Sequence, residues 1–199
     1  MTLSKRIASF LGATLLFSLP SCSSQSLDEP APENQVVLKS QETEPKPIWV
    51  GKNFTTTETA VLIFLQKRGI TDKAALATIM CNIKQESKFD TRVCEGGVRT
   101  GYHGCHRGGF GLIQWTTAGR YRGLGIFAKN HGLDPNSLEA QLRWMVNETE
   151  WRTIDYVWKT PNKSIDGYMW AAKKWLGWGV HGARTTYAHQ YYQQLTPSK

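Results

Sequence analysis

The chain has 199 residues and a formal net charge of +8, from 24 basic and 16 acidic side chains. This length allows one domain of ordinary size preceded by a shorter segment of different composition. The basic residues are scattered along the chain and form no run of the kind that binds a phosphate backbone. The composition therefore argues against nucleic acid as a partner.

The first residues have the pattern of an export signal. Lys5 and Arg6 precede a 13-residue run of small and apolar residues at positions 7–19. A membrane-spanning helix needs roughly 20 apolar residues, so the run is too short to span a bilayer. Residues 1–21 are therefore predicted to be a secretory signal peptide.

The end of this signal suggests lipidation. Residues 19–22, Leu-Pro-Ser-Cys, resemble a bacterial lipobox, in which the cysteine is acylated and becomes the mature N-terminus. Pro20 departs from the pattern, because a small or β-branched residue is commoner there. We expect a lipoprotein attached through Cys22 to a membrane of the bacterial cell envelope or periplasm. The alternative is simple cleavage followed by secretion.

Residues 22–47 contain four prolines, five acids and few large apolar groups, a composition typical of a disordered tether. Residues 48–199 hold 20 basic and 11 acidic side chains, so the predicted folded part is about +9. A basic exported domain suits anionic lipid or the carboxylate-bearing bacterial wall. A solvated basic surface would explain most individual lysines equally well.

Two helices are predicted at the start of this folded part. Thr55 and Glu58 form a capping-box pattern that opens a helix closed by residues 68–69, Arg-Gly. Residues 71–72, Thr-Asp, cap a second helix that extends to about Ser87.

Glu86 occupies an apolar position on this second helix. At 100° per residue, it falls about 20° from the direction of Ile79 and on the same side as Ile83. Burial and the free carbonyl groups of the helix end both raise the pKa of a carboxyl group. A carboxyl group that is protonated near neutral pH is what a general acid requires. Alternatively, Glu86 is solvated at the rim of the core or paired with a cation, the candidates being Lys52, Lys88 and Arg92.

The segment 89–111 has many glycines, two cysteines and no helical period, so we expect loops with a small hairpin. A helix resumes near Thr117 and ends at residues 131–132, and Asp134-Pro135 opens another. The last third carries regularly spaced aromatic residues, which we expect to form helical core, although some of them could line a sugar-binding groove. The pattern predicts a mainly α domain with one small lobe inserted after the second helix.

Three cysteines follow Cys22. Outside the cytoplasm, Cys94 and Cys105 are the natural disulfide pair, and the bond would contribute about 3 kcal/mol. A zinc site with His103 and His106 is the competing interpretation, but the spacing fits no familiar ligand pattern, so no metal is expected. Cys81 is expected to be a small buried thiol.

The order of these elements resembles the lysozyme-like glycosidases. A helix ends in Glu86-Ser87, a loop-rich lobe follows, and Gly-x-x-Gly-Leu-x-Gln stands at 108–114. The chain is similar to phage tail-tip lysozyme domains over roughly residues 55–195, through segments 82–90 and 111–116. Further matching residues are Arg120, Arg122, Trp175, Arg184 and Tyr191. The long cysteine-bearing lobe and Cys81 depart from the family pattern.

The resemblance implies a lysozyme-like fold of the α+β type for residues 48–199 and peptidoglycan as the substrate. Glu86 would then protonate the glycosidic oxygen between N-acetylmuramic acid and N-acetylglucosamine. The glycines of 108–111 would let the backbone approach the sugar, unless they serve a plain tight turn. No cofactor is implied. The implied substrate-binding residues are Ser87, Phe110, Gly111, Gln114 and Trp115.

Two of these residues have more specific expectations. Gln114 would hydrogen-bond Glu86 or a sugar, and Ser87 would steady Glu86 or have no role beyond ending its helix.

The second carboxylate is open. Asp90 is expected to cap the helix end or a turn, and Glu95 is the candidate for a second catalytic acid. A lytic transglycosylase, which forms 1,6-anhydro products, needs only one acid. The sequence is also compatible with a wall-binding module without catalysis and with a chitin-cleaving enzyme. We expect a monomer.

Overall fold

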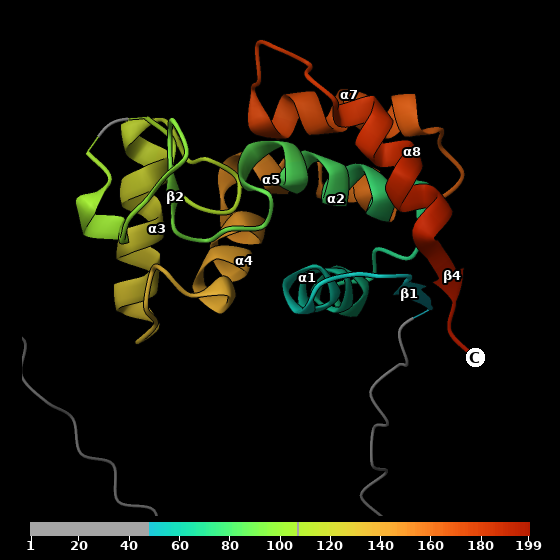
Figure 1. The fold of residues 1–199 in the computed structure, drawn as a ribbon, viewed down its shortest axis with the longest axis horizontal. Helices are drawn as coiled ribbons and strands as arrows, with labels where there is room; N and C mark the ends of the chain where they lie inside the picture. Colours follow the sequence, from blue (N-terminus) through green and yellow to red (C-terminus); the bar gives the residue numbers. More distant parts are fainter. Residues whose placement is uncertain (1–47, 107) are drawn as a thin grey trace, which may run out of the picture. The chain divides into compact units, whose positions relative to one another are not determined.

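The computed structural model describes residues 48–106 and 108–199 (Figure 1). The predicted signal peptide over residues 1–21, the lipidation site at Cys22 and the tether that ends at residue 47 all lie outside the described residues. Within the described ranges, no helix is long and apolar enough to cross a membrane.

The described chain is mainly helical with a small inserted lobe, which confirms the predicted fold class. In chain order the elements are β1 (Trp49–Gly51), α1 (Thr56–Lys67), α2 (Lys73–Ser87), β2 (Val93–Cys94), β3 (Val98–Arg99), the 3-10 helix η1 (Tyr102–Gly104), α3 (Ala118–Asn130), α4 (Leu138–Asn147), α5 (Thr149–Arg152), α6 (Asp155–Lys159), α7 (Ile165–Leu176), α8 (Arg184–Gln194) and β4 (Leu195–Pro197).

Helices α1 and α2 begin with the predicted caps. The Thr55 hydroxyl accepts from the Glu58 amide, and the Glu58 carboxylate accepts from the Thr55 amide at 2.8 Å. Asp72 accepts from two amides of the first turn of α2. These side chains satisfy donors that have no partner inside a helix, so both helix starts are fixed by local sequence.

Helix α4 begins at Leu138, later than the sequence predicted. Asp134 Oδ1 accepts from the Asn136 amide at 2.9 Å, which closes a turn before the helix. Ser137 then caps α4 by accepting from the Ala140 amide at 3.1 Å. The Asp134-Pro135 pair therefore marks a turn, and Ser137 is the cap.

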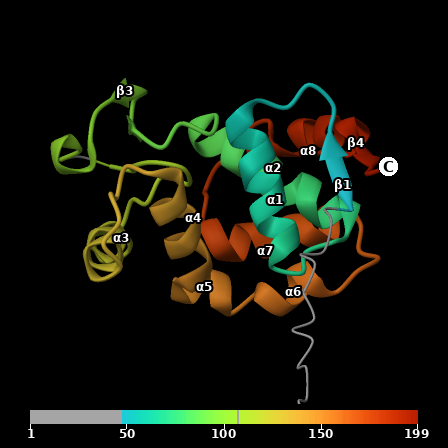
Figure 2. The same cartoon turned by 90° about the horizontal axis from the view of Figure 1, so that it is seen from below.

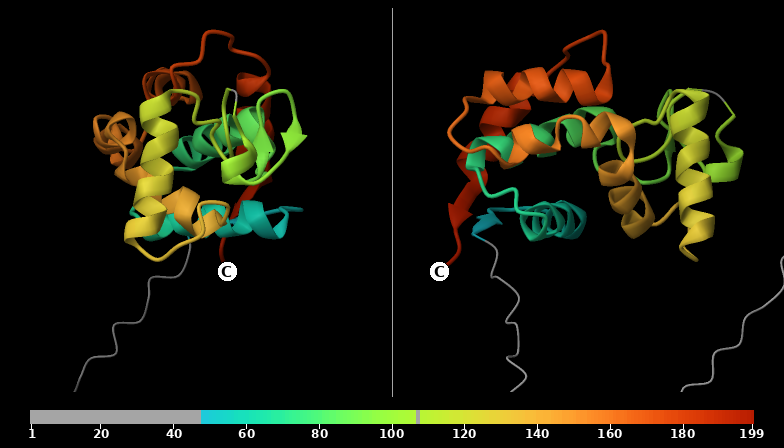
Figure 3. Two further views of the ribbon diagram at one scale, coloured as in Figure 1. Left: turned by 90° about the vertical axis from the view of Figure 1, so that its left-hand side faces the viewer. Right: turned by 180° about the vertical axis from the view of Figure 1, so that it is seen from behind.

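Helix α2 lies at the centre of the helical body, between α1 on one side and α7 and α8 on the other (Figures 1 and 3). Eleven of its 15 residues are buried. Cys81 is one of them, with a free thiol, as expected. Burial raises the pKa of this thiol to about 12. A helix enclosed in this way holds the residues at its end in a rigid position.

The tryptophans of the last third pack against one another beside α2. Trp151 meets Trp175 edge-on at 4.9 Å between ring centroids, and Trp158 lies 5.8 Å from Trp151. All three are completely buried, which confirms the prediction that these aromatics form core. Trp170, by contrast, is 56% exposed.

Strands β1 and β4 join the two ends of the described domain, an arrangement that the sequence did not predict (Figure 2). They pair antiparallel, with Val50 opposite Thr196. The Trp49 amide also donates to Gln66 of α1 at 2.7 Å. The short sheet thus fastens both ends of the domain to the first helix.

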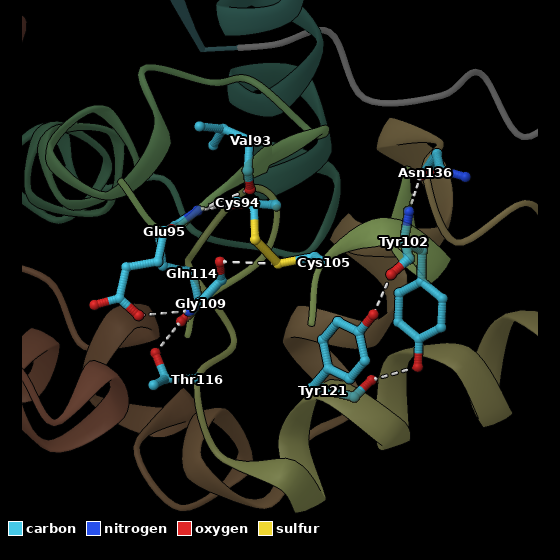
Figure 4. Close-up of a disulfide and its surroundings, with 11 residues drawn as sticks. Val93, Cys94, Glu95, Tyr102, Cys105, Gly109, Gln114, Thr116, Tyr121 and Asn136 are labelled. Carbon is cyan, nitrogen blue, oxygen red and sulfur yellow. Dashed lines mark hydrogen bonds between the residues drawn. A yellow bond between two sulfur atoms is a disulfide. The ribbon is translucent and has the colours of Figure 1, made fainter. Parts of the chain in front are cut away.

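The inserted lobe contains the predicted hairpin, formed by β2 and β3. A disulfide joins Cys94 of β2 to Cys105, with 5.7 Å between the Cα atoms, as predicted (Figure 4). Because the Cys105 sulfur is bonded to Cys94, it is not available to the zinc site considered with His103 and His106. The disulfide ties the hairpin to the segment that leads into α3.

Candidate active site

Glu86 is the penultimate residue of α2, and its side chain is 17% exposed. It lines a cleft of about 860 Å³ between helices α1, α2 and α4 and the inserted lobe that contains β2 and β3. Thr55 and Thr57 contribute from the start of α1, and Leu138 contributes from the start of α4. The hairpin contributes Gly96, Gly97 and Arg99. Glu86 is thus partly buried, as predicted, and has access to a space large enough for sugar units.

The partner of Glu86 is Arg184, the first residue of α8, which donates from Nη2 to Glu86 Oε1. None of the three cations considered from the sequence fills this position. Arg184 is itself buried and held by Asn82 Oδ1 at 2.9 Å and by the carbonyls of Val180 and His181 at 2.9 and 2.8 Å. Asn82 lies one helical turn before Glu86, so α2 supplies two of the acceptors that hold Arg184.

Burial raises the pKa of the Glu86 carboxyl group. The Arg184 guanidinium opposes this shift by favouring the carboxylate, and Arg120 opposes it more weakly, but burial is the larger effect. Oε1 is engaged by Arg184, whereas Oε2 has no hydrogen bond to any described residue. One oxygen is therefore fixed, and the other is available to carry a proton.

Two buried polar side chains hold the turn at residues 111–114 against the helices. The Ser87 hydroxyl donates to the Leu112 carbonyl at 2.7 Å. From α4, Gln141 Oε1 accepts from the Leu112 amide at 2.8 Å, and its amide nitrogen donates to Thr91 and Pro135 carbonyls. Ser87 therefore fastens the end of α2 to this turn and forms no hydrogen bond with the Glu86 carboxyl group.

Gln114 also lines the cleft, with its backbone in the left-handed region at φ 53°. Its side-chain amide donates to the carbonyls of Val93 and Gly111 at 3.1 and 3.0 Å. The expected hydrogen bond to Glu86 is not formed. Gln114 instead joins the turn to the start of the hairpin.

The order of helix, lobe and turn around this cleft agrees with the result of a comparison with protein families. The family model for phage tail lysozyme matches residues 56–195. The chain belongs to the phage tail lysozyme family. No curated protein and no solved structure matches. Membership supports a peptidoglycan-degrading, lysozyme-like function in general terms.

In this phage tail lysozyme domain, protein groups occupy the space beside the glycines of the 108–111 segment. A Cβ at Gly108 would lie 1.5 Å from a carboxylate oxygen of Glu95. A Cβ at Gly111 would lie 2.7 Å from Gln141 Oε1. Gly111 also has φ 70°, which a side chain disfavours. Close packing within the protein explains why glycine stands at both positions.

Two of the expected substrate-binding side chains are in the core. Phe110 and Trp115 are completely buried, so neither presents side-chain surface to the cleft. A contact of either residue with the substrate would have to come from the backbone, and the assignment of both as substrate-binding residues stays a prediction. The apolar residues flanking the turn anchor it, which is the commoner role of large aromatics in such a sequence.

The two candidate second carboxylates differ in position. Glu95 is exposed and accepts from the Gly109 amide at 3.1 Å (Figure 4), and it is not among the described residues that line the cleft. Asp90 does line the cleft. Its Oδ1 accepts from the Arg92 amide at 2.9 Å, which closes the expected turn, and its Oδ2 is paired with Arg99.

A second buried glutamate, Glu148, was not identified from the sequence. Its two oxygens accept from Trp115 and Trp175, each at 3.1 Å, and from Arg120 at 2.8 and 2.5 Å. Burial raises the pKa of Glu148, and the donors oppose that shift. Arg120 and Trp175, which match the family pattern, thus have a shared acceptor. No local sequence signal links them to position 148.

Proposed function

We propose that this protein cleaves the β-1,4 bond between N-acetylmuramic acid and N-acetylglucosamine in peptidoglycan, with Glu86 as the general acid. The carrying observation is the geometry of Glu86, a largely buried carboxyl group of raised pKa in a cleft beside the lobe, with one oxygen that has no partner among the described residues. Family membership supports the same substrate. Proton donation from Oε2 to the glycosidic oxygen would assist departure of the leaving sugar.

Arg184 would then position the carboxyl group of Glu86 and stabilise the carboxylate that forms when it donates its proton. Its contact with Oε1 fixes the carboxyl group, and its charge stabilises the carboxylate that remains after the proton has left. The opposing effects of burial and Arg184 bring the two protonation states closer in free energy. A group that must give up and regain a proton in each cycle benefits from this balance. Gln114, which lines the same cleft, is proposed to contact the sugar.

A lytic transglycosylase is the second candidate, and the state of the other carboxylates favours it. Among the described residues that line the cleft, the second carboxylate is Asp90, which is already paired with Arg99. Hydrolysis commonly uses a second carboxylate as base or nucleophile. Transglycosylation uses the hydroxyl of the substrate itself, and one acid is sufficient.

The function is tested with residues 48–199 on a peptidoglycan suspension. We expect the wild type to clear it and Glu86→Gln to clear it at least 100-fold more slowly, because general acid catalysis contributes about 10²–10⁴-fold. Both proteins should sediment with the walls equally. Clearing by Glu86→Gln at the wild-type rate would disprove the assignment, and equal activity on chitin would point to a chitin-cleaving enzyme.

Mass spectrometry of the released fragments separates the two reactions. Ends with a 1,6-anhydro ring identify a transglycosylase, and reducing ends that have gained water identify a hydrolase. For a hydrolase, Glu95→Gln and Asp90→Asn distinguish the proposed second acid, Glu95, from the turn residue Asp90. Loss of activity in Asp90→Asn alone would reverse that assignment.

We also propose that the protein acts in the bacterial envelope as a monomer, attached to the membrane through a lipid on Cys22. The support is the pattern of residues 1–22, and secretion after cleavage is the alternative. In a bacterial host, labelled palmitate should enter the full-length chain but not Cys22→Ala. Equal labelling of both would exclude lipidation at this cysteine.

A further inference from the structure

Lys88 follows the helix that carries Glu86 and has an unfavourable backbone conformation. Its φ and ψ are 52° and 34°, in the left-handed region that residues with a Cβ disfavour. Phe89 and Gln114, which line the same cleft, also have positive φ. The Phe89 side chain is buried in the core, and the Gln114 side chain bonds two carbonyls. Their side chains thus have structural roles.

The Lys88 side chain has no such role. It is exposed, and it makes no hydrogen bond, ion pair or ring contact with any described residue. Glycine would adopt the same backbone conformation without strain. The local structure therefore does not explain why a lysine occupies this position.

The charges of the cleft point to a ligand for Lys88. Four charged side chains line it among the described residues: Glu86, Lys88, Asp90 and Arg99. Glu86 is paired with Arg184, and Asp90 is paired with Arg99. The ammonium group of Lys88 is the charge left without an opposite partner in the described part of the cleft. Such a group attracts an anion from outside the protein.

We propose that Lys88 binds a carboxylate on the peptide stems of the substrate and so makes the cleft specific for carboxylate-bearing glycan over neutral glycan. This inference rests on the proposed function. Peptide stems carry carboxylates, whereas chitin has none. Because Lys88 is not the proton donor, its contribution belongs to substrate binding and should appear in KM, with kcat unchanged.

The test uses sonicated glycan strands that retain their peptides, and the same strands after carbodiimide coupling to ammonia, which converts carboxylates to neutral amides. Lys88→Asn removes the charge with a residue that tolerates left-handed backbone, and Lys88→Arg keeps the charge. The matched control is Lys52→Asn, which removes an exposed lysine outside the cleft lining.

On native strands, we expect Lys88→Asn to raise KM by about two- to fivefold, the range for an exposed ion pair. Lys88→Arg and Lys52→Asn should keep the wild-type KM. On amidated strands, the wild type and Lys88→Asn should have the same KM. An unchanged KM for Lys88→Asn on native strands, or the same increase on both substrates, would overturn the proposal.

The test of Lys88 can fail without the proposed role of Glu86 failing, and the reverse also holds. If Glu86→Gln is inactive while Lys88→Asn behaves as the wild type, the role of Glu86 stands and that of Lys88 is excluded. If Glu86→Gln retains wild-type activity, the proposed acid is wrong, whatever the KM of the Lys88 variants.

Discussion

Residues 48–106 and 108–199 contain two largely buried glutamate–arginine pairs that differ in what surrounds the carboxylate. In the pair of Glu148 and Arg120, the glutamate side chain is 1% exposed and both oxygens are engaged by donors. In the pair of Glu86 and Arg184, the glutamate side chain is 17% exposed and one oxygen is free of described partners. The first pair faces tryptophans, and the second faces a cleft.

This difference shows that burial and an arginine partner do not by themselves identify a catalytic acid. Burial raises the pKa of both carboxyl groups. At Glu148, however, all four hydrogen bonds come from N–H groups that cannot act as acceptors. A proton on either oxygen would therefore point at a donor. Glu86 has an oxygen on which a proton can reside. This difference supports the proposal that Glu86 is catalytic, and we propose a structural role for Glu148.

The largest expected effect is on stability at Glu148. In Glu148→Gln, the new NH₂ group must face two donors whichever oxygen it replaces, and the arginine loses its counter-charge. We expect a loss of about 3–5 kcal/mol in the free energy of unfolding, measured by urea denaturation. Glu150→Gln is the control, because Glu150 lies 3.9 Å from Arg120 but is 39% exposed. A loss below about 1 kcal/mol for Glu148→Gln would contradict the structural role that distinguishes Glu148 from Glu86.

The second prediction concerns Arg184 and the pH dependence of activity. Arg184 favours the ionised form of Glu86, so its removal should raise the pKa of Glu86 further. In Arg184→Met, the limb of the kcat/KM profile along which activity falls with rising pH should move to higher pH. Arg184→Lys keeps the charge and should leave this limb closer to its wild-type position. Movement to lower pH in Arg184→Met would contradict the role given to Arg184.

The smallest effect is expected on stability at Glu86. In Glu86→Gln, the amide oxygen still accepts from Arg184, and the NH₂ group replaces an oxygen that has no described partner. The free energy of unfolding at neutral pH should change by less than about 1 kcal/mol. A loss as large as that of Glu148→Gln would show that both glutamates are structural.

The difference in the free energy of unfolding between the wild type and Glu86→Gln should depend on pH with a definite sign. Because the pKa of Glu86 is raised in the folded protein above 4.5, the folded state holds more protons than the unfolded state between these two values. Wild-type stability relative to Glu86→Gln should therefore fall as pH rises through this window and stay constant above it. A relative stability that rises with pH there would contradict the direction of the shift.

The sequence predicted the features that depend on local patterns. The capping residues Thr55 and Asp72 and the apolar position of Glu86 follow from spacing within a few residues. The Cys94–Cys105 pair closes a loop with a sequence separation of 11. Helical periodicity likewise indicated that most aromatics of the last third form core, although Trp170 is exposed. Such features are predictable because neighbouring residues on one element share a face.

The partners from distant parts of the chain were not predictable. Arg184 stands 98 residues from Glu86, and Glu148 stands 28 residues from Arg120. The packing of the helices determines these contacts, and it cannot be predicted from the local patterns of a single sequence. For the same reason, the burial of Phe110 and the pairing of β1 with β4 were missed. The partner decides the electrostatics of each glutamate, so the sequence predicted the position of Glu86 on its helix but not its electrostatic environment.

The most direct test is a titration of Glu86 itself. The carboxyl carbon of Glu86, labelled with ¹³C and assigned by comparison with Glu86→Gln, can be followed by NMR across the pH range in residues 48–199. We expect a midpoint above 4.5, the ordinary value of a glutamate, because burial outweighs the opposing charge of Arg184. A midpoint at or below 4.5 would mean that Arg184 holds Glu86 as a carboxylate, and the assignment of Glu86 as the proton donor would then be contradicted.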